Sequence, residues 1–435
     1  MITYEKAGWP LILGAAALAA LTGAQLAASS ARVAVVIPLA AAGLAVLAYL
    51  AVTRFALFVA AALAVRASLD LAKGTLDTRT VGGAAELPLW LDPGTLLGVL
   101  FLLAGTVWLA VQPRISVRPA IVFFFCVAAL SAVGSSDPVT SAGETLRLAA
   151  WLLMIVVVAC LVRQDRELVG PLLTAVFVAA IPPIALTLYQ VVSGSDQAYV
   201  HGVLQPHGTF WHPNGLGLFS MLLLLMSLSV LPWSGSRLVM GVLLAGLAFT
   251  LVASEARTAW FGAVAGLIVV ALLQDRRIWF VIGLAGAAAA VILPSSLGES
   301  RTEAGFAGNS VVWRFDHWQQ ALGLMERNPV TGTGLGTTKL LIVKEVHNDY
   351  LRAIVETGLL GLAAYAALLV TLALAAARAL RTARAGIDRG VAVGLAACVA
   401  ALAVAALADN VMTSVAVMWY LAAFAGLALG IGVRR

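Results

Sequence analysis

The sequence predicts an all-α, polytopic membrane protein built as a bundle of about 14 spans. Of its 435 residues, 62% are hydrophobic and only 11% are charged, whereas soluble domains carry about 25% charged residues. Apolar runs of about 18 to 22 residues recur along the chain, the length that a helix needs to cross a hydrocarbon layer. The runs lack the alternation of barrel strands, and backbone groups inside a bilayer must be bonded within their own segment, so helices are expected.

The predicted spans are joined by short connections along most of the chain. Two of the early, Ala-rich spans can merge or lie shallow in the membrane, and about 12 is the alternative count. Both counts are even and place the two termini on the same side of the membrane. Pro182 and Pro183 are expected to kink the seventh span. The spans are expected at about 10–28, 33–52, 55–73, 95–111, 119–134, 147–162, 168–192, 213–231, 238–254, 257–273, 278–293, 350–375, 390–408 and 411–432.

Arginine placement predicts the orientation of the bundle, because short cytoplasmic loops of membrane proteins are enriched in Lys and Arg. One side, predicted to be cytoplasmic together with both termini, receives Arg114, Arg118, Arg163, Arg166, Arg276, Arg277, Arg378, Arg381, Arg384, Arg389, Arg434 and Arg435. The other side receives the predicted periplasmic loops 74–94, 135–144, 193–212 and 294–349. The net charge of +6 is thus explained by loops beside spans, and no nucleic-acid partner is predicted.

The chain is expected to form one integral membrane domain, residues 1–435, with the large periplasmic loop 294–349 inserted between spans. Residues 1–10 lead into the first span without a small-residue cleavage pattern and are interpreted as part of an uncleaved helix. The cysteines lie inside apolar runs and are interpreted as small buried hydrophobic residues without a disulfide: Cys126, Cys160 and Cys398.

An amphipathic helix is expected within the large loop, over residues 310–327, and Asn328-Pro329 is expected to stop it. Its apolar face has the spacing of three and four residues in Val311, Phe315, Trp318, Leu322 and Met325. The helix is expected to lie on the membrane surface or to pack on the bundle. The glycine-rich stretch 331–336 that follows is expected to be flexible.

The informative polar residues gather in the predicted periplasmic loops. All five histidines lie there: His201, His207, His212, His317 and His347. Arg257 lies at the mouth of a span, and Arg314 lies on the loop helix. Each arginine can simply extend to the lipid headgroups. The functional alternative is that the two guanidinium groups bind phosphate oxygens in a bidentate manner, and a pyrophosphate on a polyprenyl-linked sugar donor is the natural ligand at a water boundary.

His347 lies where the large loop re-enters the membrane as a helix. The positive end of the helix dipole disfavours imidazolium, so the ring is expected to be neutral near pH 7. A neutral imidazole can accept a proton, as a general base must when it activates a sugar hydroxyl. The alternative is a capping or interfacial histidine without chemistry.

Two further groups of polar residues have structural interpretations. A metal site at His201, His207 and His212 is not favoured, because the spacing matches no zinc pattern, and neither a metal nor another cofactor is predicted. The segment around His207 instead indicates a shaped loop, in which Asn214 can cap the next span. Arg66 and Asp70 lie four residues apart in a span and are interpreted as a structural pair, with Arg66 reaching the donor as the alternative.

Four motifs together resemble the O-antigen ligase/polymerase superfamily, and they cover roughly residues 208–361. Each motif alone is weak, but their order, with the long loop before the last group, is fairly specific. They are Gly208-Thr209-Phe210 with Pro213-Asn214; Ser254-x-x-Arg257-Thr258-Ala259-Trp260; Arg314 ahead of Asn328-Pro329-x-x-Gly332-x-Gly334; and His347-Asn348-x-x-Leu351 with Glu356-x-Gly358-x-x-Gly361.

The resemblance implies a metal-independent, GT-C-type membrane glycosyltransferase. Such an enzyme takes glycan from an undecaprenyl-pyrophosphate carrier, and in ligases it transfers the glycan to a lipid A-core acceptor. The family's loop histidine corresponds to His347, and its loop arginines correspond to Arg257 and Arg314, which are the expected catalytic residues. The expected substrate-binding residues are His207, Asn214, Asn348 and Arg66. In one departure, many relatives have an arginine where this chain has Gln205, and His207 is a candidate to supply part of that polarity.

The expected activity is therefore that of an O-antigen ligase in the bacterial inner membrane, with its active site at the periplasmic face and membrane lipids around it. The main alternative within the family is an O-antigen polymerase, which the sequence separates poorly from a ligase. A protein O-oligosaccharyltransferase is a third possibility, although these tend to carry an additional carboxy-terminal portion. From another class, a transporter or flippase is less favoured, because its ionisable groups usually lie near the bilayer midplane.

Overall fold

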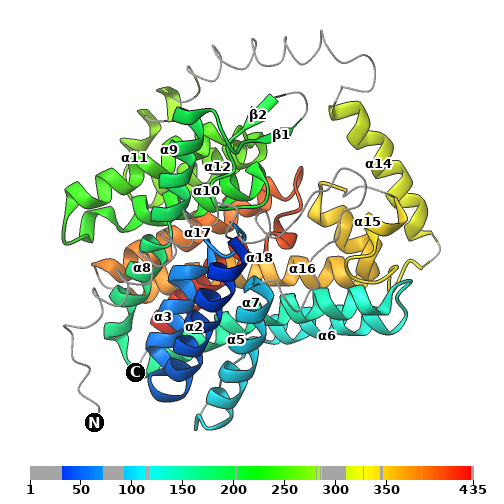
Figure 1. Cartoon of the computed structure of the whole chain (residues 1–435), viewed down its shortest axis with the longest axis horizontal. Coiled ribbons are helices and arrows are strands. Elements are labelled where there is room, and N and C mark those ends of the chain that lie inside the picture. Colours follow the sequence, from blue (N-terminus) through cyan, green and yellow to red (C-terminus); the bar gives the residue numbers. More distant parts are fainter. Residues whose placement is uncertain are drawn as a thin grey trace.

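The computed structural model confirms an all-α bundle (Figure 1). It describes residues 32–71, 93–113, 115, 117–200, 203–280, 282–284, 286, 310–326, 328–342, 346–383 and 385–432, without the side chains of 32–41, 203 and 310–316. The expected span at 10–28 lies outside the described residues, as does most of the one at 278–293. A short antiparallel hairpin, β1 (Ala198–Val200) with β2 (Val203–Gln205), was not predicted.

The helices follow the apolar runs of the sequence closely. Their bounds are α2 Arg32–Thr53, α3 Phe55–Arg66, α5 Pro93–Ala110, α6 Pro119–Val133, α7 Pro138–Gln164, η2 Arg166–Leu168, α8 Val169–Val178, α9 Ile181–Ser193, α10 Pro213–Val230, η3 Leu231–Trp233, α11 Arg237–Ala253, α12 Arg257–Leu273, α14 Ser310–Met325, α15 Thr338–Leu341, α16 Asp349–Thr382, α17 Ile387–Ala405, η5 Val411–Thr413 and α18 Val415–Ile431. Among the described residues, six helical stretches have the length and composition to cross a membrane, and shorter apolar helices accompany them.

Two local expectations have definite outcomes. The kink in the seventh span is confirmed, because helix α8 ends at Val178 and α9 begins at Ile181, with Pro182 and Pro183 in the first turn of α9, where a missing N–H costs nothing. The predicted loop 135–144 is wrong beyond its first residues. Asp137 caps α7 by accepting hydrogen bonds from the N–H groups of Val139 and Thr140, so the helix already begins at Pro138.

Helix α18 lies at the centre of the bundle. Nearly all its residues are buried, as expected for a helix that is apolar on every side. It packs most extensively on α7, where a Cβ atom added at Gly426 or Gly430 would lie 2.6 Å from Val158 or Val162. These two glycines, spaced four residues apart, allow the two backbones to approach closely.

The loops segregate to the two ends of the bundle in the way that the predicted topology requires. At one end, Gln164 contacts Gln112, and Arg166 pairs with Asp388. At the other end, which we call the histidine end because it carries His347, Thr209 Oγ1 donates to the carbonyl of Ala67 at 2.6 Å. Segments predicted to share a side of the membrane therefore contact one another.

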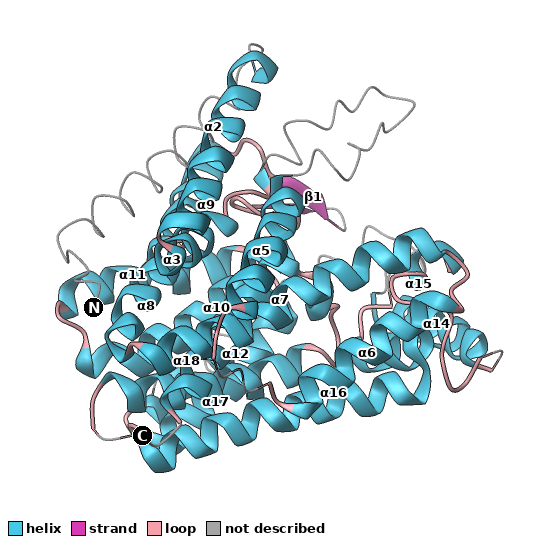
Figure 2. Ribbon diagram, turned by 90° about the horizontal axis from the view of Figure 1, so that it is seen from below, coloured by secondary structure: helices cyan, strands magenta, loops and turns pink. Residues whose placement is uncertain are grey.

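The long segment between α12 and α16 folds back on the bundle at the histidine end. Helix α14 packs on α16, and this agrees with the expectation that the loop helix packs on the bundle. Helix α6 runs along the other side of α16 (Figures 1 and 2). Trp318 and Ala321 of α14 contact Ile342, Val346 and Val355 in a small apolar cluster. This cluster holds α14 beside the segment that precedes α16.

Candidate functional site

The backbone around His347 is fixed on both sides of the residue. Trp318 Nε1 donates to the carbonyl of Val346 at 2.9 Å. Asn348 caps α16, because its Oδ1 accepts from the N–H groups of Tyr350 and Leu351, each at 3.0 Å. His347 itself has φ of 50°, a left-handed conformation that is uncommon for a residue with a side chain. The neighbours therefore hold this strained residue in place, and its side chain remains 29% exposed.

The partner of His347 is Asp409, which lies in the turn between α17 and η5. His347 Nδ1 lies 3.6 Å from Asp409 Oδ1, and the carboxylate side chain is only 7% exposed. The N–H of Asn410 donates to Oδ1 at 2.8 Å, and Thr258 Oγ1 donates to Oδ2 at 2.9 Å. Burial by itself raises the pKa of Asp409, but the adjacent imidazole and these donors outweigh burial and hold the pKa below its ordinary value. Asp409 is therefore a buried carboxylate that favours its charged form.

Sequence reasoning missed Asp409, although a signal for it exists. Between Arg389 and Arg434 it is the single residue among Asp, Glu, Lys and Arg. A lone carboxylate between two apolar helices is by itself a reason to suspect a functional site.

Asp409 also connects His347 to the arginine motif. Thr258 follows Arg257 directly, and both belong to the first turn of α12. Arg257 is exposed at this helix start. The turn before it contains Glu255 in a left-handed conformation, φ 51°, whose carboxylate accepts from Gln205 Nε2 at 3.2 Å. The structure thus brings Thr258 of the Arg257 motif and His347 to the same carboxylate.

Arg314 is placed only by its backbone. It lies in α14, which packs against α16 beside His347, and its side chain lies outside the described residues.

Arg66 is buried at the histidine end, at 3% exposure. Its Nη1 lies 3.1 Å from Asp70 Oδ1, and its guanidinium lies 6.0 Å from the centre of the Trp419 ring. A Cβ atom added at Gly94 would approach the same guanidinium to 3.3 Å. This enclosure favours the structural interpretation of the pair, in which Arg66 fastens α3 to α18.

In the segment before α10, the rings of His207 and His212 bond to nearby backbone groups. His207 Nδ1 donates to the carbonyl of Phe210 at 2.6 Å. His212, not Asn214, caps α10, since its Nδ1 accepts from the N–H of Asn214 at 3.1 Å. The expected Asn214 cap is therefore wrong, because Pro213 begins the helix and the capping position falls one residue earlier. His201 lies outside the described residues.

The glycine-rich stretch was expected to be flexible, but in the structure residues 332–338 are buried, and their backbone groups are hydrogen-bonded. The N–H groups of Thr333 and Gly334 donate to the carbonyls of Val355 and Glu356 at 3.0 and 2.9 Å. The glycines supply positive φ angles, 71° at Gly332 and 109° at Gly334, and a Cβ atom at Gly332 would lie 2.3 Å from the backbone of Glu356. Glycine thus serves close approach here and not mobility.

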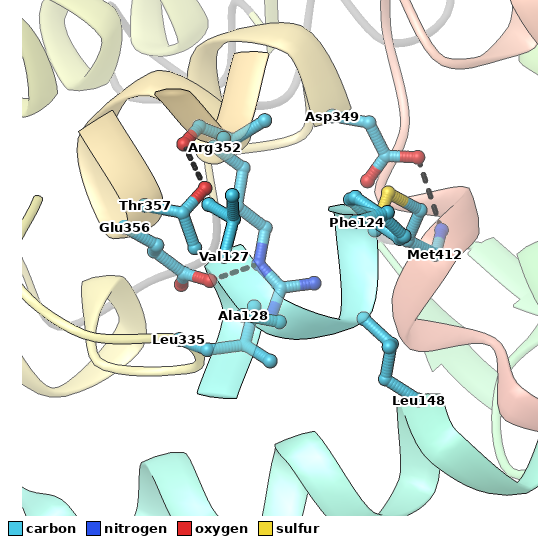
Figure 3. Close-up of a pocket in the computed structure, with 12 residues that line it drawn as sticks. Phe124, Val127, Ala128, Leu148, Leu335, Asp349, Arg352, Glu356, Thr357 and Met412 are labelled. Carbon is cyan, nitrogen blue, oxygen red and sulfur yellow. Dashed lines mark hydrogen bonds and ion pairs between the residues drawn. The ribbon is translucent and has the colours of Figure 1, made fainter. Parts of the chain in front are cut away.

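An ion pair in α16 anchors the same stretch and lines a small cavity. Glu356 accepts from the N–H groups of Gly336 and Thr338 at 2.8 and 3.2 Å, and pairs with Arg352 at 3.0 Å. Figure 3 shows this pair on one side of the cavity and Asp349, bonded to the N–H of Met412, on the other. The first turns of α16, directly after His347, are therefore held by buried polar contacts on several sides.

The fold and this site define a helical membrane protein that carries a histidine–carboxylate pair beside an arginine motif at one end of its bundle. A family model described as O-antigen ligase matches residues 242–366, from α11 into α16, and includes Arg257, Arg314 and His347. The match covers this part of the chain and supports its assignment to the O-antigen ligase/polymerase family, in agreement with the resemblance that the motifs indicated. The family suggests a glycosyltransferase-like enzyme that acts on lipid-linked glycan. No curated protein matches the chain.

Proposed function

We propose that the protein is an O-antigen ligase, which transfers glycan from an undecaprenyl-pyrophosphate carrier to a sugar of the lipid A-core. The observation that carries the proposal is the contact between His347 and Asp409, which Thr258 joins to the Arg257 motif. A base and a cationic helix start at one end of a membrane bundle suit a reaction between two lipid-anchored substrates at the water boundary.

The geometry supports a role for His347 as general base. The Asp409 carboxylate can only accept hydrogen bonds, so it favours the tautomer with a proton on Nδ1, in which Nε2 carries the lone pair that can take a proton. Nε2 would remove the proton from the acceptor hydroxyl while that oxygen forms a bond to the anomeric carbon of the donor. The bond from this carbon to the pyrophosphate oxygen breaks, and the carrier pyrophosphate leaves. Asp409 would stabilise the imidazolium that results.

The remaining predicted residues bind the substrates or support the site in this proposal. Arg257 and Arg314 would bind the pyrophosphate and stabilise the charge that develops on it, without a metal ion. His207, Asn214 at the start of α10 and Asn348 would line the substrate path. Arg66, which is buried, would support the donor cleft by holding α3 in place.

The placement in the cell follows from the arginines. The end opposite His347 carries the excess of arginine, so we propose that it faces the cytoplasm, with both termini, and that the histidine end faces the periplasm of the inner membrane. This places the site where carrier-linked glycan and the lipid A-core can meet.

Replacement of His347 by alanine tests the proposal. We expect glycan transfer by the purified protein, from carrier-linked glycan to lipid A-core with a chelator present and no ion gradient, to fall about 100-fold to 10,000-fold, since this is the usual contribution of a general base. His317→Ala is the matched control, because it removes another histidine of the same long segment, and we expect transfer near the original rate.

The outcomes separate the competing functions. Undiminished transfer by His347→Ala would remove this residue as the base. A deletion strain with naked core supports a ligase, whereas core capped by a single repeat unit indicates a polymerase. Failure of the purified, unmodified protein to transfer glycan at all would count against both and favour transport.

A further inference from the structure

The hydroxyl of Thr258 bonds differently from those of three other buried helical threonines. Thr145, Thr187 and Thr357 each donate to the carbonyl four residues earlier in the same helix, at 2.6 to 2.7 Å. Thr258 is the second residue of α12 and has no preceding helical turn to bond to. Its hydroxyl instead crosses to Asp409, 151 residues along the chain. The position at the helix start thus frees this hydroxyl for a contact between helices.

The contact divides the Asp409 carboxylate into two assigned oxygens. Oδ1 faces His347 Nδ1 and the N–H of Asn410, whereas Oδ2 receives Thr258. Thr258 and Asp409 are 8% and 5% exposed, so water has little access to replace a lost donor. The Thr258 hydroxyl and the Asn410 N–H together therefore fix the rotation of the carboxylate, and this rotation decides whether Oδ1 points at the imidazole.

We propose that Thr258 is a positioning residue, which holds Asp409 so that His347 is aligned for proton transfer. The same contact keeps His347 at a fixed position relative to Arg257. This inference rests on the proposed function, because it assumes that His347 is the base. Thr258 does not touch the reacting atoms in this scheme. It acts through Asp409, and the first turn of α12 thereby couples the cationic helix start to the base.

The charged groups around this corner set the direction of the pH effect. Asp409 is faced by His347 before α16 and by Thr258 on α12, and it repels Asp349 at the start of α16, whose charge Arg352 attracts. Arg257, which directly precedes Thr258, is the charged residue of α12. Without the Thr258 donor, burial raises the pKa of Asp409 with less opposition, so the carboxylate becomes neutral at a higher pH. The acid limb of the transfer reaction should then move to higher pH.

The test compares Thr258→Val with Thr258→Ser in the full chain, with transfer measured across pH. Loss of one hydrogen bond to a buried charged group lowers a rate about tenfold to a hundredfold. We therefore expect Thr258→Val to reduce kcat by this factor at neutral pH and to shift the acid limb upward, and Thr258→Ser, which keeps the hydroxyl, to restore both. Thr250→Val is the control, because Thr250 is a buried helical threonine bonded to Ser220 and Leu247 and distant in role from Asp409.

Each outcome decides one statement. If Thr258→Val loses activity in proportion to its lower amount in the membrane, with an unchanged pH profile that matches Thr250→Val, Thr258 is only structural and the proposal is overturned. A shifted acid limb that serine restores supports it. If His347→Ala transfers glycan normally, the proposed base itself fails, and this result is independent of the Thr258 variants.

Discussion

At the scale of single residues, the site depends on a charge that the apolar bundle would normally exclude. Asp409 remains ionised because three groups compensate its burial: the His347 ring, the Thr258 hydroxyl and the N–H of Asn410. A buried carboxylate with this many donors is expensive to build and easy to disturb. The same donors that favour its charge also orient it, so electrostatics and geometry at His347 cannot be varied separately.

Asp409 gives a stability that depends on pH with a definite sign. Its pKa is lower in the folded than in the unfolded protein, so its contribution is complete above the ordinary value of about 3.9 and is lost as the pH falls through the lower folded-state pKa. We expect the Tm of the purified protein to exceed that of Asp409→Asn at pH 6, and the gap to close as the pH falls below about 4. Asp275→Asn, which changes an exposed carboxylate, is the control for general acid effects. A gap that is the same at every pH would contradict this account.

At the scale of elements, α16 is two helical pieces joined at a break. Gly358 has φ of 70° and ψ of −170°, and a Cβ atom there would lie 2.0 Å from the carbonyl of Val330. The ring centroids of Tyr350 and Tyr365, which lie on either side of the break, are 5.4 Å apart. The glycine-rich stretch packs into the space beside this break, and its backbone is bonded to Val355 and Glu356. The element that positions His347 is therefore a clamp formed by α16 and this stretch together.

Glu356 is the polar centre of that clamp, and its replacement should be costly. Glu356→Gln removes the carboxylate that is hydrogen-bonded to the buried Arg352, whose side chain is 12% exposed, and breaking a buried pair in this way costs about 3 to 5 kcal/mol. We expect the free energy of unfolding in detergent to fall by this amount, and the double variant Glu356→Gln with Arg352→Gln to recover part of it. Asp388→Asn breaks the more exposed pair with Arg166 and should cost at most about 1 kcal/mol. Equal losses in the two pairs would argue against the clamp.

At the scale of the whole molecule, the sequence predicted the spans and the side of the bundle on which each loop lies, because the membrane imposes both. It did not predict contacts that depend on the tertiary fold. The spans were predictable because chain length and polarity must match the bilayer, and the pairing of loops at each end followed from their alternation. Asp409 was missed because its contacts with His347 and Thr258 join residues 62 and 151 positions apart. The glycines at 332 and 334 were misjudged as flexible because a positive φ angle serves a tight packed turn as well as a mobile one.

The orientation of the whole bundle is the last prediction, and it follows from the same arginine bias that ordered the spans. Ser195 is exposed at the histidine end, before β1, and Gly235 is exposed at the opposite end, where a Cβ atom would meet nothing within 4 Å. We expect a membrane-impermeant maleimide to label Ser195→Cys in intact cells with a permeable outer membrane, and to label Gly235→Cys only after the inner membrane is broken. The unmodified chain, whose cysteines lie in the spans, provides the blank. The reverse pattern would place His347 in the cytoplasm, away from carrier-linked glycan and lipid A-core exposed to the periplasm, and the ligase proposal would then have to be abandoned even if the contacts around Asp409 were correct.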